Sequence, residues 1–387
     1  MSRPAWALWK NPIKGVLVIL FKLISIVRPL PKSPNLAGWS PKRILIFSTA
    51  GIGDTLSDTP AIRAVKESLP AAHVAVVVHR KRKAVLASNP WIDSLISHHK
   101  GILQFFLTLK TIRALRPDIA IILRANDPDI WPLAYLSGAD VVLSRPENTV
   151  FPFLVNCPAR IDHSPDLPGV VQTLDIVKHI GATTNDPRIV YAIREEERRE
   201  MEVHILFRKS GPNSDASYAR VRVAVQIHHS PRLLFRDWPV ESFVDLCRMI
   251  LEKYPVQLFL TGGPADIGKG RAILDGLQRL GIQDHVVNFI GKLGLRETAA
   301  LLDRCACFVT TDTGIMHLGF ALNISTLALL HPYNARRVGP HGYGSRHRVV
   351  VMQGPESGES GLRRALTELK PETVFTNFEE LYKETIS

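Results

Sequence analysis

Two successive series of short apolar runs, separated by helical stretches, constrain the fold of this 387-residue chain more than any other feature. The first series contains RILIFS (43–48), HVAVVV (73–78) and the run 118–123, with stretches of helical character between them. Continuous apolar strands that alternate with helices are typical of a parallel sheet covered on both faces. The first series therefore predicts a doubly wound α/β domain.

The second series follows a polar, charged stretch over 194–222. Five runs in this series predict strands: VRVAVQI (221–227), VQLFLTGG (256–263), VVNFIG (286–291), CFVTTDTG (307–314) and STLALL (325–330). The pattern indicates no clear strand after 325–330. Two doubly wound domains joined by a linker leave a cleft between them, which is a common place for a ligand. Because such sheets bind ligands at the carboxyl ends of their strands, we expect functional residues in the loops at those ends.

The length of the chain fits two domains of roughly 150–200 residues each. We expect a basic, hydrophobic head and proline-rich spacer over 1–41, a first domain over 42–193, a linker over 194–220 and a second domain over 221–387. The four cysteines form no CxxC pair, which argues against a disulfide scaffold and against a structural zinc site.

The net charge of +12 is concentrated at the N-terminus, where residues 1–43 contain eight Lys and Arg and no Asp or Glu. A basic head on a nearly neutral body suggests an anionic partner, either lipid or nucleic acid. The core of the head is aliphatic, which suits lipid better than stacked bases. We therefore expect a membrane surface as a partner and no nucleic acid.

The apolar run VLVILFKLISIV (16–27) is well short of the about 20 residues that span a membrane. If a helix begins at Pro12, four polar residues fall within an arc of about 120° around its axis: Lys14, Lys22, Ser25 and Arg28. Two apolar residues, Val18 and Phe21, lie within the same arc and interrupt it. We expect an amphipathic helix lying in the cytoplasmic leaflet of a membrane. The alternative is a helix packed on the protein's own core.

The loop after the first strand, TAGIGDT (49–55), contains glycines beside one carboxylate, Asp54. It lacks the third glycine of a GxGxxG fingerprint, and a basic run, 80–83, follows the second strand where a dinucleotide site needs an acid. Binding of NAD is therefore a poor fit. Asp54 is placed where a substrate hydroxyl can approach the backbone closely, and the alternative role is a helix cap.

The segment TDTGIMH (311–317) predicts a strand that ends in a helix N-terminus. Asp312 and Thr313 supply caps, Gly314 lets the backbone approach a ligand, and His317 lies on the first turn. The free N–H groups of such a helix start suit a diphosphate. The alternative is an ordinary capped helix with a core histidine.

Three further residues of the second domain are candidates for ligand contacts. Asp266, in LTGGPAD (260–266), is available to a ribose or sugar hydroxyl, and Arg236, in SPRLLFRDWP (230–239), offers a cation for phosphate. Ser230 lies in the loop that follows the first strand of this domain. In the first domain, Gly53, Arg63 and Arg80 are candidates for contacts with a substrate, which the resemblance described next makes an acceptor.

Taken together, these elements resemble glycosyltransferase family 9, the bacterial ADP-heptose:lipopolysaccharide heptosyltransferases. The matching segments are the following: RILIFSTAGIGDTLSDTPAIRAVKESLP, NPWIDSLI, FRDWPVESF, LTGGPAD and VTTDTGIMHLGFALNISTLALLHPYN, with VGP after it. They occur in this order and cover roughly residues 42–340 in the strand and helix context that the motifs need. The pair of GIGD and DTGxxH carries most of the specificity.

The resemblance implies a GT-B fold, with two Rossmann-like domains facing a cleft, and metal-independent transfer with inversion and no cofactor. It makes Asp54 the general base. It assigns donor binding to the DTGxxH motif, which begins at Asp312, and to Arg236, which stands where the family usually has Lys. The loop 228–232 departs from the family's small Gly/Thr-rich turn.

The implied donor is a nucleotide sugar such as ADP-heptose, and the implied acceptor is an anionic glycolipid at the cytoplasmic face of the inner membrane. The function we expect is transfer of a heptose or related sugar to a lipopolysaccharide-core or similar acceptor. The alternative is a non-catalytic, membrane-associated protein that binds glycolipids or sugar nucleotides on the same scaffold.

Overall fold

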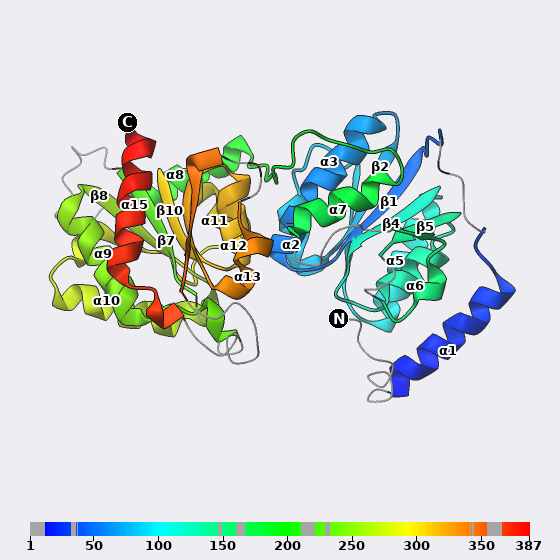
Figure 1. The fold of residues 1–387 in the computed structure, drawn as a ribbon, viewed down its shortest axis with the longest axis horizontal. Helices are drawn as coiled ribbons and strands as arrows, with labels where there is room; N and C mark the ends of the chain where they lie inside the picture. Colours follow the sequence, from blue (N-terminus) through cyan, green and yellow to red (C-terminus); the bar gives the residue numbers. More distant parts are fainter. Residues whose placement is uncertain are drawn as a thin grey trace. The chain divides into compact units, whose positions relative to one another are not determined.

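A computed structural model describes residues 12–31, 36, 38–145, 149–159, 167–209, 221–228, 233–340, 342, 344–353 and 366–387. The chain forms two compact units, Met1–Pro187 and Arg188–Ser387. Each unit contains one parallel sheet with helices on both faces (Figure 1). The expected α/β class, with two doubly wound units, is confirmed.

The sheet of the first unit has six strands in the order β3-β2-β1-β4-β5-β6. Their bounds are β1 Arg43–Ser48, β2 His73–His79, β3 Ser94–His98, β4 Ile119–Arg124, β5 Val141–Ser144 and β6 Cys157–Pro158. All neighbouring strands pair in parallel. The runs that predicted strands are the buried central strands, because helices cover both of their faces.

Seven helices of the first unit are described, and their bounds are α1 Pro12–Val27, α2 Ile52–Ser57, α3 Thr59–Ser68, α4 Lys83–Leu86, α5 Ile102–Ala114, α6 Ile130–Leu136 and α7 Gly169–Lys178. The helix α6 is almost wholly buried: Ile130, Leu133 and Ala134 have no exposed surface. It packs with α5 and lies in the same core cluster as residues of α1.

The N-terminal helix α1 packs on the first unit, as in the alternative of a helix on the protein's own core, and its contact with a membrane stays a prediction. Its ring of Phe21 is 8 % exposed and packs edge-on against Phe151 with the centroids 5.9 Å apart, and Val18 packs against the same cluster. The two residues that interrupt the polar arc thus help to attach the helix to the first unit, together with Ile24. Most of the other large apolar side chains of α1 are exposed. Among the described residues, no helix is long and apolar enough to cross a membrane.

The sheet of the second unit has six strands in the order β12-β11-β10-β7-β8-β9. Their bounds are β7 Val221–Gln226, β8 Val256–Thr261, β9 Val286–Asn288, β10 Cys307–Thr311, β11 Ser325–Leu330 and β12 His347–Val351. The expectation that 325–330 is the last strand is wrong, because β12 follows it and pairs with β11. This edge strand is partly exposed, so it lacks the continuous apolar run that marks the inner strands.

The helices of the second unit have the bounds α8 Glu195–Lys209, α9 Val240–Lys253, α10 Ile267–Arg279, α11 Leu295–Leu302, α12 Gly314–Ala321, α13 Pro332–Val338 and α15 Pro371–Ile386. The boundary between the units falls before α8, and α8 packs against α11. Much of the stretch that we expected as a linker over 194–220 is therefore a helix of the second unit, fixed by the ion pair between Arg198 and Asp303 at 2.9 Å.

Candidate functional site

The carboxyl edge of the first sheet brings three candidate residues onto neighbouring strands. Asp54 follows β1, Arg80 follows β2, and Arg124 is the last residue of β4. In the sheet order β2-β1-β4 these strands are adjacent and parallel, so their ends meet at one edge.

Asp54 lies in the first turn of α2, and its side chain is 49 % exposed. One carboxylate oxygen, Oδ2, accepts the backbone N–H of Gly51 at 3.1 Å, which holds the start of the helix. The capping role that was the alternative for Asp54 is therefore present in the structure. It orients the carboxylate and leaves about half of the side chain open to solvent.

The second oxygen of Asp54 is held by Arg124, a residue that the sequence analysis missed. Arg124 Nη1 donates to Asp54 Oδ1 at 3.0 Å, and Arg124 Nε lies 3.5 Å from Asp58 Oδ1. The Arg124 side chain is 18 % exposed. Gly169, at the start of α7, makes room for it, since a Cβ there would lie 2.8 Å from the Arg124 Cζ. A single guanidinium thus bridges two carboxylates.

Asp58 is the buried partner in this arrangement, with no exposed surface. Ser48 Oγ, at the end of β1, donates to its Oδ2 at 2.6 Å. Burial raises the pKa of Asp58 to about 7, although Arg124 and the Ser48 hydroxyl both act to lower it, and the negative charge of Asp54 raises it further. The signal in the sequence is the second acid of GDTLSD, one helical turn after Asp54.

The three acceptor candidates have different surroundings. Gly53 lies in the first turn of α2 beside Asp54, and Arg80 is exposed. Arg63 is 6 % exposed, pairs with Asp186 at 3.1 Å and lies over the ring of Trp91. This placement favours a structural role for Arg63, and its acceptor contact stays a prediction without support from the geometry.

The expectation of a metal-independent reaction took the sequence to contain no Asp-x-Asp motif, which is wrong, because an Asp-Pro-Asp triplet, Asp127 to Asp129, follows β4. Asp127 pairs with Lys100 at 2.9 Å, and Asp129 Oδ2 lies 3.1 Å from the Nε2 of the buried His98. The part of the chain that the structure describes contains no group of three or more His, Cys, Asp or Glu side chains placed to hold a metal ion.

In the second unit, Asp312 joins the ends of three neighbouring strands. It follows β10 and is 3 % exposed. Asn334 Nδ2, just after β11, donates to Asp312 Oδ2 at 2.6 Å, and Arg236 Nε, in the loop after β7, lies 3.2 Å from the same oxygen. The Arg236 guanidinium stays 28 % exposed and lies over the ring of Phe235. It is therefore held in place with part of its surface open.

The start of α12 is capped by Thr313 as the sequence predicts, whereas Asp312, also expected as a cap, instead contacts Asn334 and Arg236. The Thr313 side chain accepts the N–H of Met316 at 3.3 Å, and the helix begins at Gly314. Gly319 lets α12 approach β10 closely, since a Cβ there would lie 2.7 Å from the ring of Phe308. His317 is half-buried, and its ring packs edge-on against Phe320 with the centroids 6.1 Å apart, so its contact with a donor stays a prediction.

Asp266 is 4 % exposed, and its Oδ2 accepts the N–H of Gly263 at 2.7 Å. Its Oδ1 lies 3.8 Å from His228 Nδ1. Burial lowers the pKa of His228, and the positive charge of Arg236 lowers it further, against the effect of Asp266. Asp266 therefore acts first as a capping and pairing group, and its contact with a donor stays a prediction. Ser230 lies outside the described residues.

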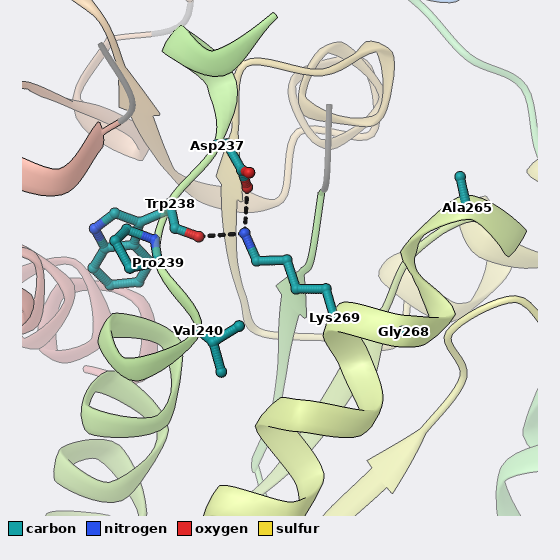
Figure 2. A pocket seen from close by; sticks show the side chains of 7 residues that line it. All are labelled: Asp237, Trp238, Pro239, Val240, Ala265, Gly268 and Lys269. Atoms are coloured by element: carbon teal, nitrogen blue, oxygen red, sulfur yellow. Dashed lines mark hydrogen bonds and ion pairs between the residues drawn. The ribbon is translucent and has the colours of Figure 1, made fainter. Parts of the chain in front are cut away.

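A pocket of about 470 Å³ lies beside the Arg236 loop, between the starts of α9 and α10 (Figure 2). Lys269, from α10, reaches across it: its Nζ donates to Asp237 Oδ1, to the carbonyl of Trp238 and, at 3.2 Å, to the carbonyl of His228. The Lys269 side chain is 8 % exposed. Lys269 thus ties the loop after β7 to α10. The remaining lining of the pocket is mostly apolar or backbone.

These observations define a class of protein. Such a protein consists of two α/β units, each with a parallel sheet, and the polar residues that are candidates for substrate contacts lie at the carboxyl edges of the sheets. The chain belongs to glycosyltransferase family 9, the heptosyltransferase family, whose model matches residues 161–367. This match confirms the resemblance seen in the sequence.

Three relatives place the chain further. It is 28 % identical over 154 residues to lipooligosaccharide heptosyltransferase 2 of Haemophilus influenzae; the match covers 38 % of this chain and 43 % of that relative, so the chain spans less than half of its length. The glycosyltransferase family 9 structure from Veillonella parvula has a TM-score of 0.73 at 21 % identity, covering 89 % of this chain and 97 % of that one. ADP-heptose lipopolysaccharide heptosyltransferase II of Escherichia coli has a TM-score of 0.72 at 18 % identity, covering 89 % and 100 %. These likenesses show the fold.

Proposed function

We propose that this protein transfers a heptose from ADP-heptose to a lipopolysaccharide-core type of glycolipid, with inversion at the anomeric carbon and without a metal ion. The observation that carries the proposal is an exposed, oriented carboxylate, Asp54, at the carboxyl edge of one sheet in a chain that belongs to the heptosyltransferase family. Two of the relatives named above are heptosyltransferases, and one of these two is named with its ADP-heptose donor.

Asp54 acts as the general base in this account. Its carboxylate accepts the proton of the acceptor hydroxyl while that oxygen attacks the anomeric carbon and the bond from this carbon to the diphosphate breaks. Attack from the face opposite the leaving group inverts the configuration. Gly51 and Arg124 hold the two carboxylate oxygens, so the base is oriented before the acceptor arrives.

The second unit supplies the groups that stabilise the departing diphosphate. The N–H groups at the start of α12 and the partly exposed guanidinium of Arg236 favour negative charge at the carboxyl edge of the second sheet. Asp312 orients Arg236, and Thr313 fixes the helix start. Arginine suits this task because its planar fork binds phosphate oxygens in pairs.

The metal-free character of the reaction is supported by the surroundings of the Asp-Pro-Asp triplet. Asp127 and Asp129 each have a basic partner, Lys100 and His98. In this account, fixed protein charges and helix N–H groups do the work of stabilising the leaving group.

The acceptor in this proposal is an anionic glycolipid at the cytoplasmic face of the inner membrane. Arg80, exposed at the same sheet edge as Asp54, supplies a cation for its phosphate or carboxylate groups. The exposed apolar side chains of α1 attach the protein to the membrane surface, with Lys22 exposed beside them.

Calorimetric titration with ADP-, GDP- and UDP-linked heptose or hexose tests the donor assignment. We expect tightest binding of ADP-heptose, and a loss of about tenfold or more in Arg236→Met because one charged phosphate contact is removed. Arg279→Met, an exposed arginine on α10, is the matched control and keeps the wild-type affinity. Folded wild-type protein that binds no nucleotide sugar refutes the proposal; binding without transfer to any glycolipid acceptor favours the non-catalytic alternative.

A further inference from the structure

The helix α5 exposes four large apolar side chains on adjacent turns. Ile102 is 82 % exposed, Leu103 74 %, Phe106 61 % and Leu107 50 %. Single exposed apolar residues are common on proteins, but a contiguous group on one helix marks a contact surface.

These four side chains have no part in the packing of α5 on the first unit. The opposite face of the helix supplies Leu109 and Ile112 to the core, and Arg113 Nε donates to the carbonyl of Leu136 at the end of α6 at 2.8 Å. The helix is therefore attached through one face while its other face stays apolar and open.

The helix α1 is attached to the same end of α6. Tyr135, the neighbour of Leu136, donates its hydroxyl to the carbonyls of Ile24, at 3.4 Å, and Arg28. Both α1 and α5 contribute to one core cluster and cover the buried α6. The C-terminal parts of α1 and α5 thus both contact residues at the end of α6. The large exposed apolar side chains of α1 include Val16, Ile19, Leu20, Leu23, Ile26 and Val27.

The charges around these side chains indicate what covers them. The described residues 12–31 and 100–116 contain no Asp or Glu. Six basic residues lie in the same segments with their side chains described: Lys22, Arg28, Lys100, Lys110, Arg113 and Arg116. One of them, Lys100, pairs with Asp127 from outside these segments, and the positive charge of the face rests on the other five. Apolar side chains among cations match the acyl chains and anionic headgroups of a bilayer interface. A second copy of this face would instead oppose like charges.

We propose that α1 and α5 form a two-helix membrane-binding face, in which Ile102, Leu103, Phe106 and Leu107 enter the interface of an anionic bilayer beside α1. This proposal takes one element from the proposed function, the contact of α1 with the membrane. It does not depend on which donor the protein binds or on which reaction it catalyses. A single weak anchor gives marginal binding, and a second one makes attachment stable. Contact through two helices also prevents rotation about the axis of α1, so it fixes the orientation of the first unit on the membrane.

Sedimentation with vesicles of phosphatidylethanolamine and phosphatidylglycerol tests the face in the full chain. The triple variant Leu103→Gln, Phe106→Gln, Leu107→Gln is expected to lower the partition coefficient by about tenfold or more, from the loss of apolar burial. Val203→Gln with Leu206→Gln, two residues of α8 that are 50 % and 54 % exposed, is the matched control and changes partition less than about twofold. An unchanged partition in the α5 variant overturns the proposal.

A fluorescent label localises the contact. An environment-sensitive dye attached at Phe106→Cys should shift to the blue and gain intensity with these vesicles, and a dye at Leu206→Cys should not. A response at Ile19→Cys without one at Phe106→Cys refutes the α5 contact and leaves the α1 contact standing. If the α5 variant instead converts a dimer into a monomer without changing partition, the face binds a second copy and the proposal is wrong.

Transfer to a detergent-solubilised acceptor separates this inference from the proposed function. The α5 variant should transfer sugar at the wild-type rate in detergent and more slowly on vesicles. A wild-type protein that binds vesicles through α5 but transfers no sugar in detergent contradicts the proposed function alone.

Discussion

Arg124 Nη1 and Asp54 Oδ1 lie 3.0 Å apart, although the two residues are separated by 70 positions in the sequence. The contact exists because β1 and β4 are neighbours in the first sheet and both end at its carboxyl edge. With Gly51 on the other oxygen, it fixes the carboxylate that we propose as the general base.

Replacing Arg124 by Met should therefore lower kcat while the affinity for the donor stays unchanged, because the base loses one of its two orienting contacts. We expect a loss of about 10- to 100-fold, in line with the cost of a misplaced catalytic group. Arg124→Lys keeps the positive charge but loses the planar, forked guanidinium, so its kcat should lie between those of wild type and Arg124→Met. Steady-state kinetics with parallel donor titration measure this; an equal loss of donor affinity would count against the assignment.

Gly169→Ala should disturb Arg124 without touching Asp54. A Cβ at this position would meet the guanidinium, 2.8 Å from Cζ and closer still to Nη2. We expect kcat to fall as it does in Arg124→Met, and the double variant to be no worse than Arg124→Met alone. Gly268→Ala in α10, where an added Cβ meets nothing within 4 Å, is the control. Additive losses in the double variant would show that Gly169 acts by another route.

Asp58 should make the stability of the protein fall as pH rises. Its folded pKa of about 7 lies above the ordinary value of 3.8, so between these pH values the folded protein holds a proton that the unfolded chain has released. The free energy of unfolding should therefore fall as pH rises between these two values, by up to about 1.4 kcal/mol per pH unit. The stabilising contribution of Asp58 is fully present only below pH 3.8, the ordinary pKa of the unfolded chain. Urea denaturation of wild type and Asp58→Asn from pH 4 to 8 measures the slope. Parallel curves for the two proteins would contradict the assignment.

Lys269 should be more important for stability than an exposed lysine in an ion pair. Its side chain is 8 % exposed and its partner Asp237 is 17 % exposed, so Lys269→Met leaves a largely buried carboxylate without its cation. We expect a loss of about 3 kcal/mol in the free energy of unfolding. Lys253→Met, which breaks the pair of an exposed lysine with Glu379, should cost clearly less than Lys269→Met, because solvent screens an exposed ion pair. Chemical denaturation compares the two variants; similar losses would argue against the tether.

Continuous apolar runs predicted the central strands correctly, because such runs are what a sheet covered on both faces requires. The pattern is weaker at the edges: β6 has two residues and β12 is partly exposed, so neither stands out in the sequence. The helix α8 lies in a charged stretch, and its packing on α11 and the ion pair of Arg198 with Asp303 show that it belongs to the second unit.

The positions of candidate residues could be predicted where the residue comes shortly after a strand that the sequence pattern shows, as Asp54 and Thr313 do. Arg124 could not be found in this way, since it ends an apolar strand and its role depends on which strand lies beside it. The same limit applies to Asn334 and Lys269, whose partners come from other segments of the chain. The buried state of Arg63 and Asp266 likewise depends on tertiary packing.

The most direct test of the account is single-turnover transfer from ADP-heptose to a glycolipid acceptor by wild type and Asp54→Asn, with the donor dissociation constant measured on the same samples. The exposed Glu67→Gln on α3 serves as the control. We predict that Asp54→Asn slows transfer by about 100-fold or more while its donor affinity stays within about twofold of wild type. Transfer by Asp54→Asn at close to the wild-type rate would contradict the role of Asp54 as the base and with it the central claim.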